Sequence, residues 1–231
     1  GIALQLEKQT AYGYWDPLPV LGSKTHWDYE TISPKRLFVT PNLVSGETCR
    51  QLIQWAEEIP TWTTSRHYAV PTNDVPIHQV PKLLEWFQEW MTSTCQCLLR
   101  HQFGTNRRFY VHDAFLVRYQ ASSQSHFLPL HYDESTHSMV LALNDDFEGG
   151  GSYFYAVNQT ISPTTGSMVS FRGNQLLHGG NVVTQGVRYI VAIFLYLDDD
   201  TCGGEGEPLS KRPKLLSENS KTSGFAFDFF G

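Results

Sequence analysis

The sequence has few cysteines, and they are scattered. Its 231 residues include only Cys49, Cys95, Cys97 and Cys202, which is too few for a disulfide framework. Cys95 and Cys97 stand two residues apart in a segment with helical spacing, so their side chains would point to roughly opposite sides of a helix. This arrangement suits neither a shared metal nor a mutual disulfide. We therefore interpret all four as structural thiols.

A long hydrophobic run is also missing. The longest apolar stretch, Tyr189–Leu197, is about half of what a membrane-spanning helix needs, and no early segment resembles a signal peptide. We therefore expect no membrane anchor. We expect the cytoplasm or the nucleus as the compartment, rather than the lumen of the secretory pathway.

Positive charge is in deficit. The chain has 17 Lys and Arg against 23 Asp and Glu, for a net charge of −6 and a pI near 5.8. A surface of this sign gives no general attraction to phosphate backbones, so we do not expect a nucleic acid partner. With 41% hydrophobic and 17% charged residues, the composition is that of a globular protein with one well-buried catalytic domain.

The two ends of the chain differ in composition from its middle. Residues 1–35 combine Trp15, Trp27 and several tyrosines with Pro and Gly, which is too aromatic for a disordered tail and predicts a packed N-terminal arm. Residues 201–231 are rich in Gly, Glu, Ser and Lys, which predicts a polar C-terminal tail.

Residues 36–107 have the pattern of a helical support region packed on the core. A short strand is expected at 36–40, and Ser45 is a suitable N-cap for a helix over 46–59. A second helix is expected to begin at Pro81, continue through apolar residues at helical spacing, and end before Gly104.

The pattern changes from residue 108 to residue 200. Short apolar segments alternate with turns rich in Gly, Asn, Asp and Pro, which is typical of strands. Helices followed by many short strands indicate a mainly β protein with flanking helices (α+β), whose core is a sandwich or jelly roll. The expected strands cover residues 108–119, 137–144, 152–156, 167–171 and 188–197.

Three residues form a candidate metal site. His131 and Asp133 are two apart, so on a strand they would project to the same face. His178 follows an apolar strand and a turn, where a neighbouring strand could bring it opposite that pair. Two imidazoles and one carboxylate on one face of a metal leave coordination positions open, as in non-haem Fe(II) oxygenases.

Arg188 begins the very apolar strand that follows His178. An arginine in such a strand is costly to bury without an anionic partner, and its guanidinium can bind a carboxylate through two hydrogen bonds. The distal carboxylate of 2-oxoglutarate is a natural partner. The alternative is an arginine on an edge strand that pairs with an acidic side chain of the protein.

Residues 108–198 resemble the catalytic domain of the prolyl 4-hydroxylase and procollagen lysyl hydroxylase superfamily in the order and spacing of several motifs. The matching motifs are Phe115-Leu116-Val117-Arg118-Tyr119, His131-Tyr132-Asp133, Leu141-Ala142-Leu143-Asn144, Phe147-Glu148-Gly149-Gly150-Gly151, His178-Gly179-Gly180 and Gly186-Val187-Arg188-Tyr189-Ile190.

The resemblance implies a double-stranded β-helix core with Fe(II) held by His131, Asp133 and His178. It further implies that Arg188 anchors 2-oxoglutarate, that Tyr119 hydrogen-bonds this cosubstrate, and that ascorbate is the reductant. For Tyr119 the alternative is an ordinary half-buried strand tyrosine. Collagen prolyl hydroxylases resemble one another in having Lys at the position of Arg188, so this arginine weakens a collagen-prolyl assignment.

The sequence therefore predicts a 2-oxoglutarate-dependent dioxygenase that uses O2 to hydroxylate a C–H bond of a peptidyl prolyl or lysyl residue and releases succinate and CO2. The enzyme alternatives are dioxygenases acting on a free amino acid, a small metabolite or a modified base. The others are a non-catalytic jelly-roll binding module and a cupin-like protein that holds a different metal. The pattern leaves the oligomeric state open.

Overall fold

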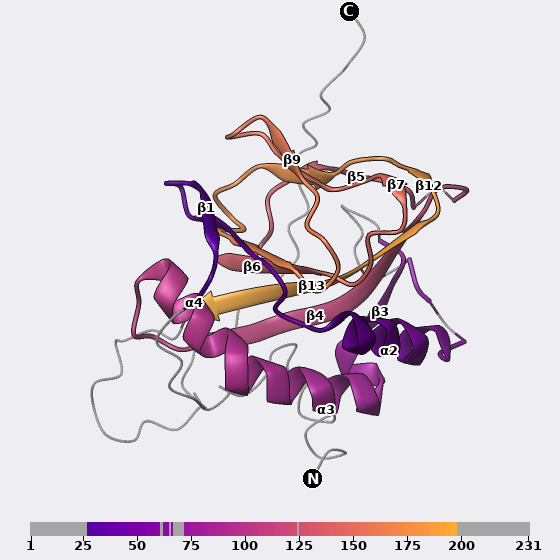
Figure 1. Ribbon diagram of the computed structural model, residues 1–231, viewed down its shortest axis with the longest axis horizontal. Coiled ribbons are helices and arrows are strands. Elements are labelled where there is room, and N and C mark those ends of the chain that lie inside the picture. Colours follow the sequence, from indigo (N-terminus) through magenta and orange to yellow (C-terminus); the bar gives the residue numbers. More distant parts are fainter. Residues whose placement is uncertain (1–26, 61, 65, 67–71, 124, 198–231) are drawn as a thin grey trace, which may run out of the picture. The chain divides into compact units, whose positions relative to one another are not determined.

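A computed structural model of the chain describes residues 27–197, except for 61, 65, 67–71 and 124. The described part is built in layers. A small sheet faces a larger sheet, and the helices α2 and α3 cover the other side of the larger sheet (Figure 1). This is the predicted mainly β fold with flanking helices. The predicted arm up to residue 26 and the predicted tail from 201 lie outside the described residues.

The helices lie in the support region, where the sequence predicted them. The helical segments are α2 (Gly46–Glu57), a 3₁₀ turn (Ile77–Gln79), α3 (Pro81–Trp90), a π-helical segment (Met91–Cys95) and α4 (Gln96–Phe103).

The helix ends follow from local chemistry. The Ser45 side chain accepts a hydrogen bond from the backbone N–H of Thr48, which satisfies one of the free donors at the start of α2. At the end of α4, Gly104 adopts a left-handed conformation with φ of 59°, which glycine reaches without steric cost. Pro81 occupies the first turn of α3. All three expected boundaries are confirmed.

The larger sheet has seven strands in the order β1-β2-β10-β6-β13-β4-β3. Its two longest members, β13 and β4, pair antiparallel near one edge of the sheet, where β3 is the outermost strand. The bounds are β1 (Glu30–Ser33), β2 (Leu37–Thr40), β10 (Met168–Phe171), β6 (His137–Ala142), β13 (Val187–Leu197), β4 (Phe109–Gln120) and β3 (Asp74–Pro76).

The smaller sheet has the order β5-β11-β8-β9, and β12 pairs with β7 in a separate two-stranded ribbon. These strands are short, and the sequence pattern indicated only β8 among them as a strand. Their bounds are β5 (Leu128–His131), β11 (His178–Gly180), β8 (Ser152–Phe154), β9 (Gln159–Ile161), β12 (Val183–Gln185) and β7 (Glu148–Gly149).

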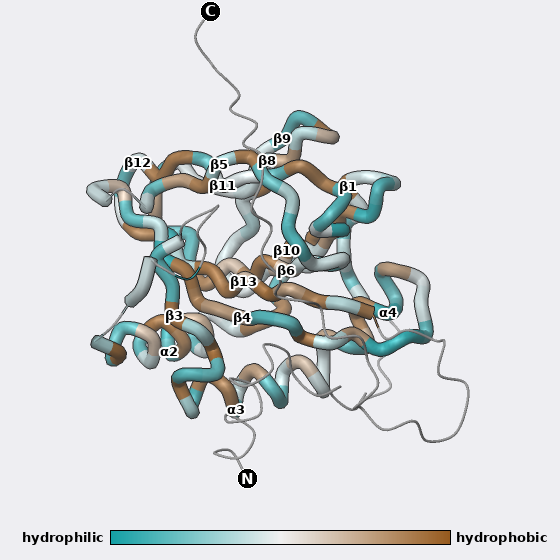
Figure 2. The backbone as a smooth tube through the Cα atoms, turned by 180° about the vertical axis from the view of Figure 1, so that it is seen from behind, coloured by the Kyte–Doolittle hydropathy of each residue, from teal (hydrophilic) through white to brown (hydrophobic). Residues whose placement is uncertain are grey.

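Alternation along β13 divides its apolar residues between two cores. On β13, Val191 and Ile193 pack towards the helices, whereas Ile190 and Ala192 face the space between the sheets. Figure 2 shows β13 and β4 as largely hydrophobic segments between the helix layer and the smaller sheet. Because β13 is buried on both faces, its sequence is almost continuously apolar.

The larger sheet also takes strands from outside residues 108–200. β1 lies within the predicted arm, and β2 and β3 lie within the predicted support region. The helical region is therefore tied to the core by backbone hydrogen bonds as well as by packing. None of the helices in the described ranges has the length and apolar character needed to cross a bilayer.

Candidate metal and cosubstrate site

The two candidate histidine ligands lie directly opposite each other on neighbouring strands. His131 is the last residue of β5, His178 is the first residue of β11, and the two are register partners. Asp133 lies two residues beyond the end of β5. The expected strand geometry of His131-x-Asp133 is therefore wrong at its second member, because the chain has left the sheet. Asp133 nevertheless reaches the same point in space.

The three side chains converge within a few ångströms. His131 Nε2 lies 3.3 Å from Asp133 Oδ1, and His178 Nε2 lies 3.5 Å from Asp133 Oδ2. One potential ligand atom from each residue lies within 4.8 Å of the others, and this is the only such trio of metal-ligating residues in the described part of the chain. A single ion can be bound by all three.

Each histidine is oriented by a backbone carbonyl. Nδ1 of His131 lies 2.8 Å from the Pro129 carbonyl oxygen, and Nδ1 of His178 lies 2.8 Å from that of Leu176. A carbonyl oxygen can only accept, so each Nδ1 carries the proton. Each neutral ring then presents the lone pair of Nε2 to the shared point, which is the arrangement expected of metal-binding histidines.

Asp133 is held through both its side chain and its backbone. Ser138 Oγ donates a hydrogen bond of 2.5 Å to Asp133 Oδ2, and the backbone N–H of Asp133 donates to the carbonyl oxygen of Gly173 at 3.1 Å. A Cβ on Gly173 would collide with the Ser138 hydroxyl and lie 3.0 Å from the Asp133 Cβ. A glycine is therefore required at this close approach.

At Asp133 and His178, the pKa shifts favour the forms that bind metal. Burial alone would raise the pKa of Asp133, but the hydrogen bond with His131, the nearby charge of His178 and the Ser138 hydroxyl together lower it. Burial lowers the pKa of His178 and outweighs the attraction of Asp133. Burial also opposes protonation of His131, yet its hydrogen bond with Asp133 raises its pKa. Metal binding is then expected to displace a proton from His131 as pH falls.

This donor set fits Fe(II). Two imidazole nitrogens and one carboxylate oxygen, all presented from one side, leave the other coordination positions for small ligands. The observation that decides the fit is the orientation of both Nε2 atoms towards the same carboxylate.

Arg188 lies near the start of β13, and its side chain reaches across to the smaller sheet. It is 4% exposed, and its hydrogen bonds are long: 3.4 Å from Nη1 to the Gly151 carbonyl oxygen and 3.3 Å from Nη2 to Ser152 Oγ. β13 lies between β6 and β4, so the alternative of an edge-strand arginine is wrong. Within the described residues, no carboxylate pairs with Arg188.

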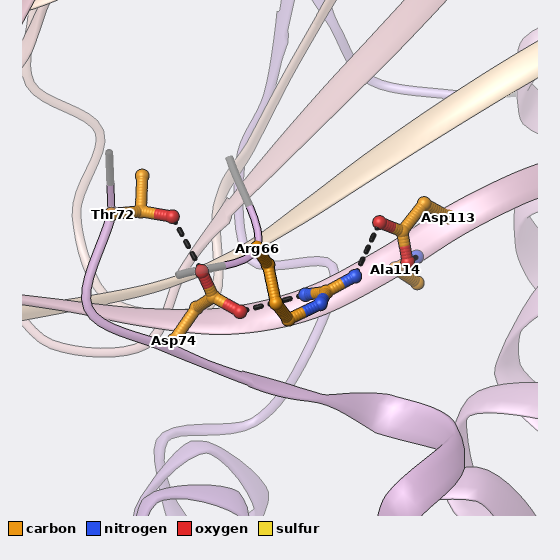
Figure 3. A network of polar contacts seen from close by, with 5 residues as sticks. All are labelled: Arg66, Thr72, Asp74, Asp113 and Ala114. Carbon is orange, nitrogen blue, oxygen red and sulfur yellow. Dashed lines mark hydrogen bonds and ion pairs between the residues drawn. The ribbon is translucent and has the colours of Figure 1, made fainter. Parts of the chain in front are cut away.

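Arg66, by contrast, is an arginine with two acidic partners. Its Nη1 and Nη2 each lie 2.6 Å from a carboxylate oxygen, of Asp74 and Asp113 respectively (Figure 3). Arg188 is more deeply buried and has no such partner in the part of the chain that the structure describes. Since burying an unpaired guanidinium is costly, its environment is that of a site for an anion that comes from outside the chain. Burial accordingly lowers the pKa of Arg188.

Tyr119 is the register partner of Arg188 on β4. It is 3% exposed, and its ring centroid lies 5.4 Å from the Arg188 guanidinium carbon. Burial raises the pKa of Tyr119 to about 12, so its hydroxyl remains protonated and can donate a hydrogen bond at neutral pH. The structure thus brings the two predicted cosubstrate residues together.

The metal cluster and Arg188 face the same space between the sheets. Ser152, which contacts Arg188, lies on β8 two residues from Phe154, and Phe154 is the register partner of His178. Two residues along a strand span about 7 Å. An elongated dicarboxylate could therefore reach from the metal cluster to the guanidinium.

The sequence pattern did not identify several residues that support this site. Ser138 holds Asp133, and the Gly151 carbonyl and Ser152 contact Arg188. The Asn144 side chain fixes the start of β13 by donating to the Val187 carbonyl oxygen and accepting from the Tyr189 N–H, both at 2.7 Å. Asn144 and the glycine run up to Gly151 lie in motifs of the family resemblance, whereas nothing in the sequence pattern marked Ser138 or Ser152.

Residues 114–209 match the family model of the 2OG-Fe(II) oxygenase superfamily. The procollagen-lysine,2-oxoglutarate 5-dioxygenase of Drosophila melanogaster is 27% identical over 170 residues, which cover 66% of this chain and 23% of the relative. Human prolyl 3-hydroxylase 2 is 40% identical over 76 residues, which cover 30% of this chain and 11% of the relative. The chain thus spans under a quarter of the length of these relatives.

Solved structures share the fold. The viral collagen prolyl hydroxylase vCPH from Paramecium Bursaria Chlorella virus-1, in its 2OG complex, has a TM-score of 0.52 and 16% identity, covering 70% of this chain and 96% of that protein. A Pseudomonas putida prolyl-4-hydroxylase has a TM-score of 0.51 and 12% identity, covering 84% and 98%. At these identities the likeness supports the jelly-roll fold and nothing finer.

Proposed function

We propose that this chain, whose 2OG-Fe(II) oxygenase domain is homologous to procollagen lysyl and prolyl hydroxylases, hydroxylates a C–H bond of a peptidyl prolyl or lysyl residue. The observation that carries the proposal is the combination of a three-donor metal cluster with a buried arginine that has no acidic partner among the described residues. Both face the same space between the two sheets.

His131, Asp133 and His178 would hold Fe(II) on the inner face of the smaller sheet. When bound, Fe(II) and 2-oxoglutarate supply the oxidising chemistry, in which O2 gives one oxygen atom to the substrate C–H bond and one to succinate, with loss of CO2. The protein's contribution is to fix the ligands and leave their opposite side open.

Arg188 and Tyr119 would position the cosubstrate. The guanidinium can bind the distal carboxylate through two parallel hydrogen bonds, and the Tyr119 hydroxyl can donate a third. The apolar side chains of Val117, Ile190 and Ala192 line the same face, where they exclude water and strengthen these polar contacts. Uptake of the carboxylate also removes the cost of the unpaired buried charge.

The proposal includes ascorbate as the reductant that restores Fe(II) after turnover without substrate. It also includes a protein or peptide as the substrate. The lysyl hydroxylase relative aligns over most of the chain, whereas the prolyl 3-hydroxylase matches a shorter segment, so both prolyl and lysyl peptides should be tested.

The test is succinate formation by the chain reconstituted anaerobically with Fe(II), followed by admission of air with 2-oxoglutarate and ascorbate. Peptides containing proline or lysine are then screened by mass spectrometry for the gain of one oxygen atom. We expect succinate from the wild type, none from His178→Ala, and wild-type amounts from His101→Ala, which removes an exposed histidine on α4.

A hydroxylated peptide with stoichiometric succinate would establish the substrate class. If the metal-loaded wild type forms no succinate with any of these peptides and binds no 2-oxoglutarate, the proposed function is wrong.

A further inference from the structure

The turn between β10 and β11 has two sides. On the inner side, the Gly173 carbonyl accepts from the Asp133 N–H, and the Leu176 carbonyl holds His178. On the outer side, the same turn lines a surface cavity of about 430 Å³, opposite the β1–β2 turn. The residues that line it are Pro34, Lys35, Arg36, Arg172, Gln175 and Leu176. The cavity therefore adjoins the candidate metal site, with only one turn of chain between them.

The described residues that line the cavity include three cationic side chains and no acidic one. Among the described residues, no carboxylate forms an ion pair with Lys35, Arg36 or Arg172, whereas Arg66 has two such partners. Burial, together with the charge of Arg36, lowers the pKa of Arg172. Two guanidinium groups thus lie close together without a counter-ion from the described residues, which creates a local positive field in a chain of net charge −6.

Structural contacts account for only part of this cluster. An Nη1 of Arg36 donates to the Phe103 carbonyl at the end of α4, and the Arg172 guanidinium lies 5.8 Å from the centroid of the Phe103 ring. A cation is favourable at a helix C-terminus, but that contact uses one of the five donors of Arg36. Lys35 is exposed and has no such structural role.

Arg36 is also held in an unfavourable backbone conformation. Its φ is 66° in the turn that closes with a hydrogen bond from its N–H to the Ser33 carbonyl at 3.0 Å. The left-handed region is sterically unfavourable for a residue with a Cβ. The turn nevertheless carries two adjacent cations, Lys35 and Arg36, to the cavity wall. Figure 1 shows β1 and α4 on the same side of the described part.

We propose that Lys35, Arg36 and Arg172 form an anion subsite that binds an acidic side chain of the peptide substrate, near the residue presented to the metal cluster. This inference rests on the proposed function. The planar guanidinium groups suit carboxylates, which they can bind through two hydrogen bonds. Three cations neutralise one or two carboxylates, whereas a nucleic acid strand requires a basic surface that extends along its backbone.

The experiment measures binding of a short fluorescent polyglutamate peptide to the full chain loaded with Mn(II) and 2-oxoglutarate, by anisotropy. We expect binding that weakens as salt rises. We also expect it to fall about tenfold or more in Arg36→Gln/Arg172→Gln, because the double variant loses charge-assisted hydrogen bonds to the carboxylates. The control is Arg50→Gln, which removes an exposed arginine of α2 outside the cavity and should leave binding unchanged. If the double variant unfolds, Lys35→Gln is measured in its place, and we expect it to weaken peptide binding by a smaller factor.

Two outcomes overturn the subsite: polyglutamate binding that is equal in the wild type and these variants, and preferential binding of an oligothymidylate of matched length. Succinate formation by the wild type without peptide separates this result from the proposed function. If the wild type forms succinate but the variants do not change peptide binding, the subsite is wrong and the proposed function stands. If the variants weaken peptide binding but the wild type neither forms succinate nor binds 2-oxoglutarate, the anion subsite stands and the proposed function is wrong.

Discussion

At the scale of single residues, the site depends on small contacts that set the direction of each ligand. The two imidazoles are each fixed by the carbonyl two residues earlier in the chain, and Asp133 is fixed by Ser138. Partners of this kind typically contribute 10- to 100-fold to metal affinity. The Ser138 hydroxyl therefore belongs to the metal site although it does not face the metal directly.

Replacing Ser138 tests this contact. In Ser138→Ala, Asp133 loses a hydrogen bond and gains rotational freedom, so we expect metal affinity to fall by about tenfold. The measurement is an anaerobic competition titration with Mn(II). Ser170→Ala is the matched control, because Ser170 is a buried serine of the same sheet whose hydroxyl bonds Gln102 instead. If Ser138→Ala and the wild type bind Mn(II) with equal affinity, Ser138 does not support the metal site.

In the absence of cosubstrate, the buried charge of Arg188 should lower the free energy of unfolding. Its charge is buried, and its two hydrogen bonds are long. Replacing buried ionic groups with apolar side chains of similar volume is often stabilising by about 1–4 kcal/mol. We expect Arg188→Met to raise the free energy of unfolding in urea by about 1 kcal/mol or more while 2-oxoglutarate binding is lost. A loss of several kcal/mol would instead identify Arg188 as a structural residue.

The candidate residues could be predicted from sequence because their chemistry is distinctive. His131, Asp133, His178 and Arg188 are residue types that metals and carboxylates require, and their spacing matched a family pattern. Ser138 could not be predicted in the same way, because its role depends on where β6 begins relative to Asp133, which lies in the loop between β5 and β6. A serine in a strand has many other uses.

At the scale of elements, strand pairing assembles the site. β5 and β11 are too short to give a periodic signal, yet their register places His131 opposite His178. The long strands β4 and β13 and the helices α2 and α3 were predicted, because burial imposes a period on their sequences. Apart from β8, the short strands of the smaller sheet and of the β7–β12 ribbon could not be predicted, since neighbouring strands rather than their own side chains specify them.

The glycine run Glu148–Gly151 supports Arg188 through its backbone. Gly150 has a φ of 67°, and a Cβ there would lie 2.8 Å from the Phe147 ring and 3.3 Å from the Arg188 Cδ. We expect Gly150→Ala to weaken 2-oxoglutarate binding while metal affinity stays near wild type, as measured by calorimetry with Mn(II). Gly104→Ala is the control. It is also at positive φ, 59°, so it should cost similar stability without changing cosubstrate binding. Equal cosubstrate affinity in both variants would contradict this role.

At the scale of the whole molecule, the layered packing buries polar groups along with the apolar core. His137 is fully buried at the start of β6, between the rings of Phe103 and Phe109. Burial, followed by the charges of Arg172, Arg36 and Arg107, lowers its pKa to about 3. The sequence analysis did not single out this histidine, because burial of this kind depends on how the helices pack on the sheet.

This histidine should make the fold sensitive to acid. The pKa of His137 in the folded chain is below its ordinary value of 6.5, so below pH 6.5 the unfolded chain binds the extra proton. The stabilisation is present above pH 6.5 and is lost as pH falls towards 3, by up to about 1.4 kcal/mol per pH unit. Urea unfolding of the wild type should show this slope between neutral pH and about pH 5, and His137→Gln should reduce it. Parallel curves for the two proteins would contradict the low pKa.

The central claim is that the metal cluster and Arg188 together form one site for Fe(II) and 2-oxoglutarate. The most direct measurement is anaerobic calorimetry of 2-oxoglutarate binding to the chain, with and without Mn(II) as a redox-stable substitute for Fe(II). We predict binding by the wild type that depends on the metal, no metal-dependent binding by His178→Ala, and binding at least about tenfold weaker in Arg188→Met, which loses charge-assisted hydrogen bonds. Absence of 2-oxoglutarate binding to the metal-loaded wild type, or equal binding by all three proteins, would contradict the account.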